Sequence, residues 1–183
     1  MSIQNIKFYS DMDGVIAVYE RHAYIGDFSE TAPIEKKPLF LREKEYFKQC
    51  LPDMTIIRTL ELLNQQVPVQ ILTNIVDGYL KPYHTQAKKE WIKQYMPFID
   101  VENQFHAITV PKATYVQEHT QKKLTMLDTL ISDYNKDLVP WSKAGGRGIK
   151  YLNGINSANS YQGEHISSDM TPEEICEIIL QTK

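Results

Sequence analysis

Short apolar segments alternate with helix-like segments along most of this chain, and this alternation limits the folds open to it. Five segments have the length and the β-branched or aromatic composition of buried strands: residues 6–10, 67–73, 105–110, 129–132 and 148–152. Helix-like stretches follow at residues 54–65, 83–95, 113–119 and 136–143, and Thr171-Pro172-Glu173-Glu174 is typical of the start of a closing helix. We therefore predict an α/β fold with a five-stranded, mainly parallel sheet and helices on both faces.

One segment, residues 19–52, interrupts the alternation. It is longer than a strand-to-helix connection needs to be, and it contains Pro33 and Pro38. A disordered insertion is the alternative, but the segment is rich in aromatic residues, which need partners to pack on. We predict a small helical cap, with a helix at about residues 41–50, inserted after the first strand into a core formed by residues 1–18 and 53–183.

Composition excludes several classes of protein. With 183 residues, 42% of them hydrophobic, and a net charge of −3, the chain resembles a soluble globular protein and lacks the basic surface that coats a nucleic acid polymer. The first residues have no signal-peptide pattern and no segment is apolar enough for a membrane span, so we expect a cytoplasmic protein. Cys50 and Cys176 are too few for a disulfide framework, and the histidines lack zinc-ligand spacing.

Two carboxylates follow the first predicted strand, in Asp11-Met12-Asp13-Gly14. Residues two apart share a face of an extended chain, so both side chains would point toward one place beyond the strand. A hard cation suits such a pair, and Mg²⁺ is typically held by one or two carboxylates together with phosphate oxygens. A plain turn is the alternative. A calcium loop is excluded because the residues after Gly14 do not supply the remaining ligands.

Polar residues also end the later predicted strands. Thr73-Asn74 follows the second, Lys112 follows the third, and Asp133 follows the fourth, with Asp137 four residues further on. At one edge of a parallel sheet these groups could bind phosphate, neutralise it and complete a metal site. Each has an ordinary alternative: a strand-end hydroxyl, a solvated lysine, or a helix N-cap.

Taken in order, these strand ends resemble the haloacid dehalogenase superfamily, whose core is a Rossmann-like sheet. The resemblance implies that Asp11 is the nucleophile that forms an aspartyl-phosphate and that Asp13 is the general acid and base. It implies Mg²⁺ bound by Asp11, the backbone carbonyl of Asp13, and Asp133, with phosphate held by Thr73, Asn74 and Lys112.

A closer resemblance is to the 5'(3')-deoxyribonucleotidases and their bacterial and phage relatives. It rests on residues 11–17, 71–73, 108–112, 130–133, 145–149 and 152–156, and on Lys88 or Lys89 with Trp91. This implies a nucleoside monophosphate substrate, for which the cap offers aromatic candidates at Tyr19, His22, Tyr24 and Phe28. Those relatives carry two aspartates where this chain has Ser132-Asp133, so Ser132 and Asp137 are expected to support the ligand Asp133 from behind.

Some alternatives stay open at this point. Lys88, Lys89 and Lys93 compete with Lys112 for the phosphate, although a solvated helix face is the expected place for them. The substrate could be another small phosphorylated metabolite, and the loss of an acid at Ser132 leaves room for a catalytically weakened binding protein. The sequence fixes neither base and sugar preference nor 5' against 3' phosphate, and it leaves a homodimer open.

Overall fold

A computed structural model describes residues 6–29, 31–154, 156 and 160–181. Its main sheet has six strands in the order β5-β4-β1-β6-β7-β8, and every neighbouring pair is parallel. The strands are β1 (Lys7–Ser10), β4 (Val69–Asn74), β5 (Phe105–Ile108), β6 (Asp128–Ser132), β7 (Arg147–Leu152) and β8 (Glu164–Ser167). The parallel α/β fold is as predicted, except that the sheet has six strands and not five.

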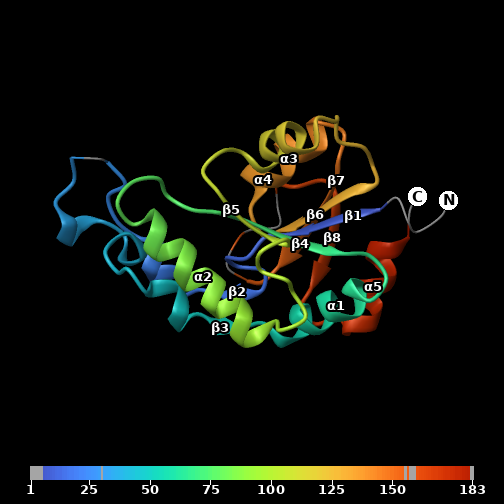
Figure 1. Ribbon diagram of the computed structural model, residues 1–183, viewed down its shortest axis with the longest axis horizontal. Coiled ribbons are helices and arrows are strands. Elements are labelled where there is room, and N and C mark those ends of the chain that lie inside the picture. The colour runs from blue at the N-terminus through green and yellow to red at the C-terminus, as the bar shows by residue number, and fades with distance from the viewer. Residues whose placement is uncertain (1–5, 30, 155, 157–159, 182–183) are drawn as a thin grey trace.

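Helices cover both faces of this sheet (Figure 1). The helices α1 (Met54–Asn64), α2 (Lys81–Tyr95) and α5 (Pro172–Leu180) lie on one face, and α3 (Lys112–Thr120) and α4 (Asn135–Lys143) lie on the other. The two hydrophobic clusters follow the alternation of β1, because Phe8 packs with the first group of helices and Tyr9 packs with the second.

Local sequence signals explain where two of the helices begin. The Asp53 side chain caps α1 by accepting from the backbone N–H groups of Thr55 and Ile56. A capping box starts α5, where the Thr171 hydroxyl accepts from the Glu174 N–H and the Glu174 carboxylate accepts from the Thr171 N–H. The predicted closing helix is thus confirmed.

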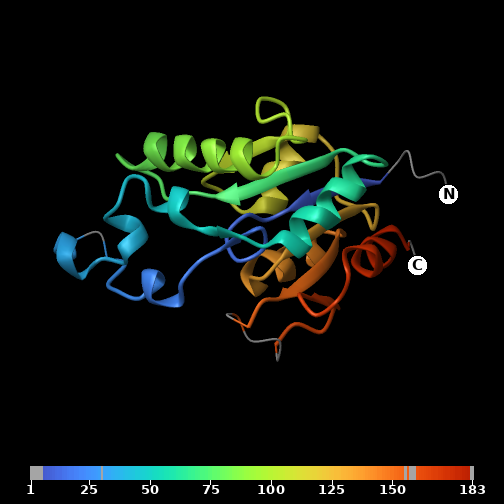
Figure 2. The same cartoon turned by 90° about the horizontal axis from the view of Figure 1, so that it is seen from below.

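The inserted segment differs from its prediction in its secondary structure. It begins and ends in a two-stranded antiparallel ribbon of β2 (Ala17–Val18) and β3 (Leu51–Pro52). Between them lie short 3₁₀ turns instead of an α-helix at 41–50: η2 (Arg21–Tyr24), η3 (Ile34–Lys36), η4 (Leu39–Leu41) and η5 (Tyr46–Gln49). Two prolines and closely spaced aromatic residues favour such turns over a periodic apolar stripe. We call residues 19–52 the cap; it projects from the end of the sheet toward which β1 points (Figure 2).

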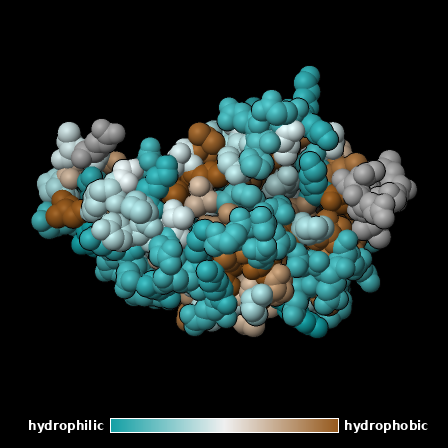
Figure 3. All heavy atoms as spheres, viewed as in Figure 1, coloured by the Kyte–Doolittle hydropathy of each residue, from teal (hydrophilic) through white to brown (hydrophobic). Residues whose placement is uncertain are grey.

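The surface and the cysteines agree with a compact protein core. Most of the face in Figure 3 is hydrophilic, with small hydrophobic areas between the polar side chains. None of the helices in the described part of the chain is both long and apolar enough to cross a bilayer. Cys50 and Cys176 are free, buried thiols.

Candidate active site

The order of the strands produces a crevice at the carboxyl ends of β1 and β6. These strands are neighbours, yet α1 follows β1 on one face of the sheet and α4 follows β6 on the other face. The chain therefore leaves the two strands in opposite directions, which opens the place where ligands bind in sheets of this kind. Asp11 follows β1 at this edge, and Asp133 follows β6.

Asp11 is buried and fully engaged by its neighbours. Its Oδ2 accepts from Lys112 Nζ at 2.6 Å and from the Ser132 hydroxyl at 3.0 Å, and its Oδ1 accepts from the Met12 backbone N–H at 2.8 Å. Lys112 is the first residue of α3 and is only 2% exposed. A buried ammonium beside this carboxylate holds it in one orientation and offsets its charge.

Asp137 completes the surroundings of Lys112. Its Oδ2 lies 2.5 Å from Lys112 Nζ and accepts from the Ser132 hydroxyl at 3.3 Å. Burial alone would lower the pKa of Lys112, but the charges of Asp11 and Asp137 outweigh it, so the pKa is raised and the lysine stays charged. Ser132 thus contacts Asp11 and Asp137, whereas its hydroxyl was expected to support Asp133.

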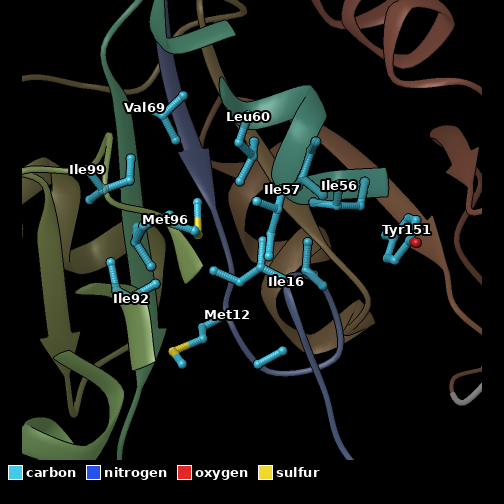
Figure 4. Packing of buried hydrophobic residues seen from close by; sticks show 14 of the residues in the cluster. Met12, Ile16, Ile56, Ile57, Leu60, Val69, Ile92, Met96, Ile99 and Tyr151 are labelled. Atoms are coloured by element: carbon cyan, nitrogen blue, oxygen red, sulfur yellow. The ribbon is translucent and has the colours of Figure 1, made fainter. Parts of the chain in front are cut away.

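The loop after β1 is tightly folded. Met12 is buried between the two aspartates, and Figure 4 shows it in one cluster with Ile16, Ile57 and Ile92. Gly14 has φ +76°, and a Cβ at this position would lie 2.2 Å from Asp133 Oδ2. Only glycine permits both the backbone conformation and this close approach, so the loop packs directly against the Asp133 carboxylate.

Two amide side chains from the loop after β7 hold Asp133. Asn153 and Asn156 donate to its Oδ2 at 2.9 and 2.5 Å, and Asn153 also donates to the Gly14 carbonyl at 2.6 Å. Lys150 Nζ donates to the Asp133 backbone carbonyl at 2.5 Å. These contacts fix the third carboxylate relative to the loop after β1.

Asp13 is paired with a second lysine, and here the sequence prediction was wrong. Lys88 is fully buried, and its Nζ donates to Asp13 Oδ2 and to Thr73 Oγ1, both at 2.7 Å. The neighbouring Lys89 is partly exposed and pairs with Glu102, as a solvated helix face would predict. The burial of Lys88 depends on β4 and the cap packing over α2, which the charge pattern of the helix does not reveal.

A cavity of about 530 Å³ opens in front of Asp11, Asp13 and Asp133, a size that suits a small molecule. Its other wall belongs to the cap, from which Tyr19, Tyr24, Phe28 and Phe40 line it. The Tyr24 ring lies 4.4 Å from Phe40 and 4.2 Å from Tyr19 between centroids. The predicted cap residues Tyr19, Tyr24 and Phe28 therefore face the carboxylates.

His22 does not line this cavity. It lies beside a separate depression with Val18 and Leu51, and its Nδ1 is 3.0 Å from Glu20 Oε2. Asn74 does line the cavity, and its side-chain amide donates to the Val110 carbonyl at 3.1 Å.

Several cavity residues were not expected from the sequence. Phe40, Tyr134 and Asn156 line it, and Lys88, which was weighed as a phosphate-binding lysine but expected on a solvated face, is buried beside Asp13. Tyr134 follows Asp133 directly, so its position at a strand end was a usable signal. The other three depend on loops and helix faces whose placement needs the tertiary structure.

The carboxylates of the cavity are crowded. Burial, reinforced by the charge of Asp11, raises the pKa of Asp133 to about 7. Burial also raises the pKa of Asp137, to about 6, against the opposing charge of Lys112. Burial raises the pKa of Asp13 although Lys88 opposes it, and Asp13 Oδ1 is a buried oxygen with no hydrogen-bond partner in the described part of the chain. Burial is the main cause in all three carboxyl groups, because it penalises their charged forms.

This donor set fits Mg²⁺. Among the described residues, no group of three or more His, Cys, Asp or Glu side chains is arranged to enclose a metal. Magnesium does not need such a cage, because it commonly takes one or two carboxylates and completes its coordination with water and substrate phosphate. The carboxylates of Asp11 and Asp133 and the backbone carbonyl of Asp13 are hard oxygen donors at one edge of the cavity.

Sequence comparisons identify no relative: no protein-family model matches the chain, and no curated protein matches it. Solved structures do match. A haloacid dehalogenase-like family hydrolase from Streptococcus pneumoniae is 16% identical with a TM-score of 0.63, and the match covers 97% of this chain and 99% of that one. The HAD-hydrolase YfnB from Bacillus subtilis, bound to magnesium, is 12% identical with a TM-score of 0.63, covering 96% and 99%.

A phosphatase is among these structures. D,D-heptose 1,7-bisphosphate phosphatase from B. bronchiseptica, in complex with magnesium and phosphate, is 11% identical with a TM-score of 0.57, covering 96% of this chain and 98% of that one. At these identities the likeness concerns the fold, and it extends over nearly the full length of both chains. The protein has the fold of the haloacid dehalogenase-like hydrolases.

Proposed function

We propose that this protein is a Mg²⁺-dependent phosphomonoesterase that acts on nucleoside monophosphates, with deoxyribonucleotides preferred. One observation carries the proposal: a buried carboxylate, Asp11, is held by Lys112 in a cavity where Asp13 and Asp133 converge. The fold supports it, since structures of the same fold include a phosphatase complexed with magnesium and phosphate.

Asp11 would act as the nucleophile. Its carboxylate oxygen attacks the phosphorus, the ester P–O bond breaks, and Asp13 gives its proton to the departing oxygen. Asp13 then takes a proton from the water that attacks the phosphorus of the aspartyl-phosphate, which releases inorganic phosphate and restores Asp11. The raised pKa of Asp13 is consistent with a group that carries a proton in one step and accepts one in the next.

The other strand-end groups would stabilise charge. Lys112 offsets the negative charge of Asp11 and of the phosphate that approaches it. Asn74 lines the cavity and is the residue proposed to meet the phosphate there, whereas the preceding Thr73 is fully buried, does not line the cavity, and accepts a hydrogen bond from Lys88. Mg²⁺, held by Asp11, Asp133 and the carbonyl of Asp13, supplies further positive charge when bound.

The cap supports the choice of a nucleotide. Tyr19, Tyr24 and Phe28 offer flat apolar surface across the cavity from the carboxylates, and base stacking on aromatic side chains is favourable for every base. Another small phosphorylated metabolite is the second candidate, because a heptose bisphosphate phosphatase shares the fold. The third candidate is a binding protein that does not hydrolyse phosphate esters. It is considered because Ser132 stands where the deoxyribonucleotidases carry an aspartate.

Phosphate release from a panel of substrates tests these candidates. The panel contains ribo- and deoxyribonucleoside monophosphates with 5' or 3' phosphate and several sugar phosphates, assayed with Mg²⁺ or with EDTA. We expect Mg²⁺-dependent release that favours deoxyribonucleotides and is lost in Asp11→Asn. Release from sugar phosphates alone would keep the chemistry and overturn the substrate, and no release at all would contradict the enzyme.

A further inference from the structure

Lys88 is a fully buried lysine with no role in the steps above. It lies in the middle of α2, and its ammonium has three hydrogen-bond acceptors: Asp13 Oδ2 and Thr73 Oγ1 at 2.7 Å, and the Asn74 carbonyl at 3.2 Å. An ammonium has three donors, so these contacts use all of them. Of the three acceptors only Asp13 carries a charge.

The remaining side of the ammonium is covered by the cap. The Phe47 ring centroid lies 4.1 Å from Lys88 Nζ, and Phe47 itself is 3% exposed. An aromatic face attracts a cation and also keeps water away from it. The cap therefore shields the Lys88 end of the pair from water, while Asp13, whose side chain is 23% exposed, lies at the cavity wall.

This arrangement treats the two oxygens of Asp13 differently. Oδ2 is bound to Lys88, whereas Oδ1 has no hydrogen-bond partner in the described part of the chain. The carboxylate cannot rotate without breaking a charged hydrogen bond to a fully buried ammonium, which is costly. Lys88 thus holds the Asp13 carboxylate in one orientation at the wall of the cavity.

We propose that Lys88 is a positioning residue for Asp13, which holds the Asp13 carboxylate in the orientation from which it exchanges a proton with the leaving group. The inference rests on the proposed phosphatase function. Lys88 is not a second phosphate-binding lysine, because its donors are already used and Phe47 covers its free side. Lys112, which lines the cavity, has that place.

Esters with different leaving groups distinguish a lysine that positions Asp13 from one that binds the phosphate. An alkyl phosphate releases a strongly basic oxygen that needs a proton, whereas p-nitrophenyl phosphate releases a stable phenolate that does not. Because kcat/KM reports the steps up to loss of the leaving group, we expect Lys88→Met to lower it about 10²-fold more for ethyl phosphate than for p-nitrophenyl phosphate. Asp13→Asn should show the same preference, and Lys89→Met, at the partly exposed neighbour that pairs with Glu102, should leave both values unchanged.

A double variant keeps the test valid if Lys88→Met alone does not fold. Asp13→Asn with Lys88→Met removes both charges of the buried pair, so no unpaired charge remains. If Lys88 acts through Asp13, adding Lys88→Met to Asp13→Asn should change kcat/KM for p-nitrophenyl phosphate by less than about 3-fold. A large further loss would overturn the inference, as would equal losses on both esters in Lys88→Met. A wild-type protein that hydrolyses neither ester nor any nucleoside monophosphate would instead contradict the proposed function.

Discussion

The strand-end groups and the cap face each other across one cavity, but they are built in different ways. Asp11, Lys112 and Asp133 follow parallel strands or begin a helix, and regular backbone hydrogen bonds set their positions. The cap consists of short 3₁₀ turns held together by stacked aromatic rings. The sheet therefore places the charged groups, and the cap supplies the aromatic wall of the cavity.

The contact between these regions runs through α2. Trp91 Nε1 donates to the Cys50 carbonyl at 2.7 Å, His84 Nε2 lies 3.2 Å from the Glu43 carbonyl, and Lys48 pairs with Glu90 at 2.8 Å. The cap is thereby attached to a core helix as well as to β2, with which its last strand, β3, pairs. We expect changes at the strand ends to affect turnover of every substrate, and changes in the cap to affect substrates selectively.

The largest effect should come from the strand ends. Lys112→Met removes the buried cation between Asp11 and Asp137, and charge-stabilising donors of this kind are worth about 10²- to 10³-fold in kcat. We expect a loss of that size on nucleotides and on p-nitrophenyl phosphate alike, measured by steady-state kinetics. Lys143→Met, at an exposed lysine of α4, is the control. If kcat fell for nucleotides alone, Lys112 would instead be a residue that determines substrate specificity.

A smaller and selective effect should come from the cap. Tyr24→Ala removes a ring of the cavity wall, and we expect about a 10-fold loss of kcat/KM on a nucleoside monophosphate with little change on p-nitrophenyl phosphate. Tyr24→Phe keeps the ring and should retain most of the activity. Tyr19→Ala should behave like Tyr24→Ala. Equal losses on both substrates would show that these rings stabilise the cap and do not select the substrate. The cap and the strand ends would then not differ in their effect on substrate choice.

The smallest effect should appear in the pH dependence of folding stability, through His84 of α2, which contacts the cap at the Glu43 carbonyl. Burial, with a contribution from the Lys88 charge, lowers the pKa of His84, so the folded protein favours the neutral imidazole. The contribution of the neutral His84 side chain to the free energy of unfolding is fully present above the usual histidine pKa of about 6.5. It is lost as the pH falls below that value. From about pH 7.5 to about pH 5.5, wild type should lose up to about 1 kcal/mol more than His84→Gln. Denaturant unfolding of both proteins measures this difference, and identical losses would show that His84 does not titrate on unfolding.

The strand-end groups were predictable because their positions follow from the alternation of strands and helices. Once Asp11 and Asp133 are assigned to the ends of parallel strands, sheet geometry brings them to one edge. The position of Lys112 was predictable for the same reason, because this residue lies after β5 at the start of α3. The closing helix was predictable from a capping box, which is a local signal.

The remaining features depend on packing between distant segments. The 3₁₀ turns of the cap have no periodic pattern of apolar residues, so a helix at 41–50 was the wrong prediction. Lys88 resembles its exposed neighbour Lys89 in sequence, and only the cap over α2 makes it buried. β8 has only four residues and follows a long connection after β7. So short a segment carries no clear strand pattern, and the sequence therefore did not predict a sixth strand.

The central claim is that Asp11 forms a bond to phosphorus, and trapping that bond tests it most directly. Wild type and Asp11→Asn would be mixed with a ³²P-labelled nucleoside monophosphate and Mg²⁺, quenched in acid within one turnover, and digested. We predict acid-stable, hydroxylamine-sensitive label on the peptide that contains Asp11 in wild type and no label in Asp11→Asn. Normal turnover without label on that peptide, or turnover that persists in Asp11→Asn, would contradict the account.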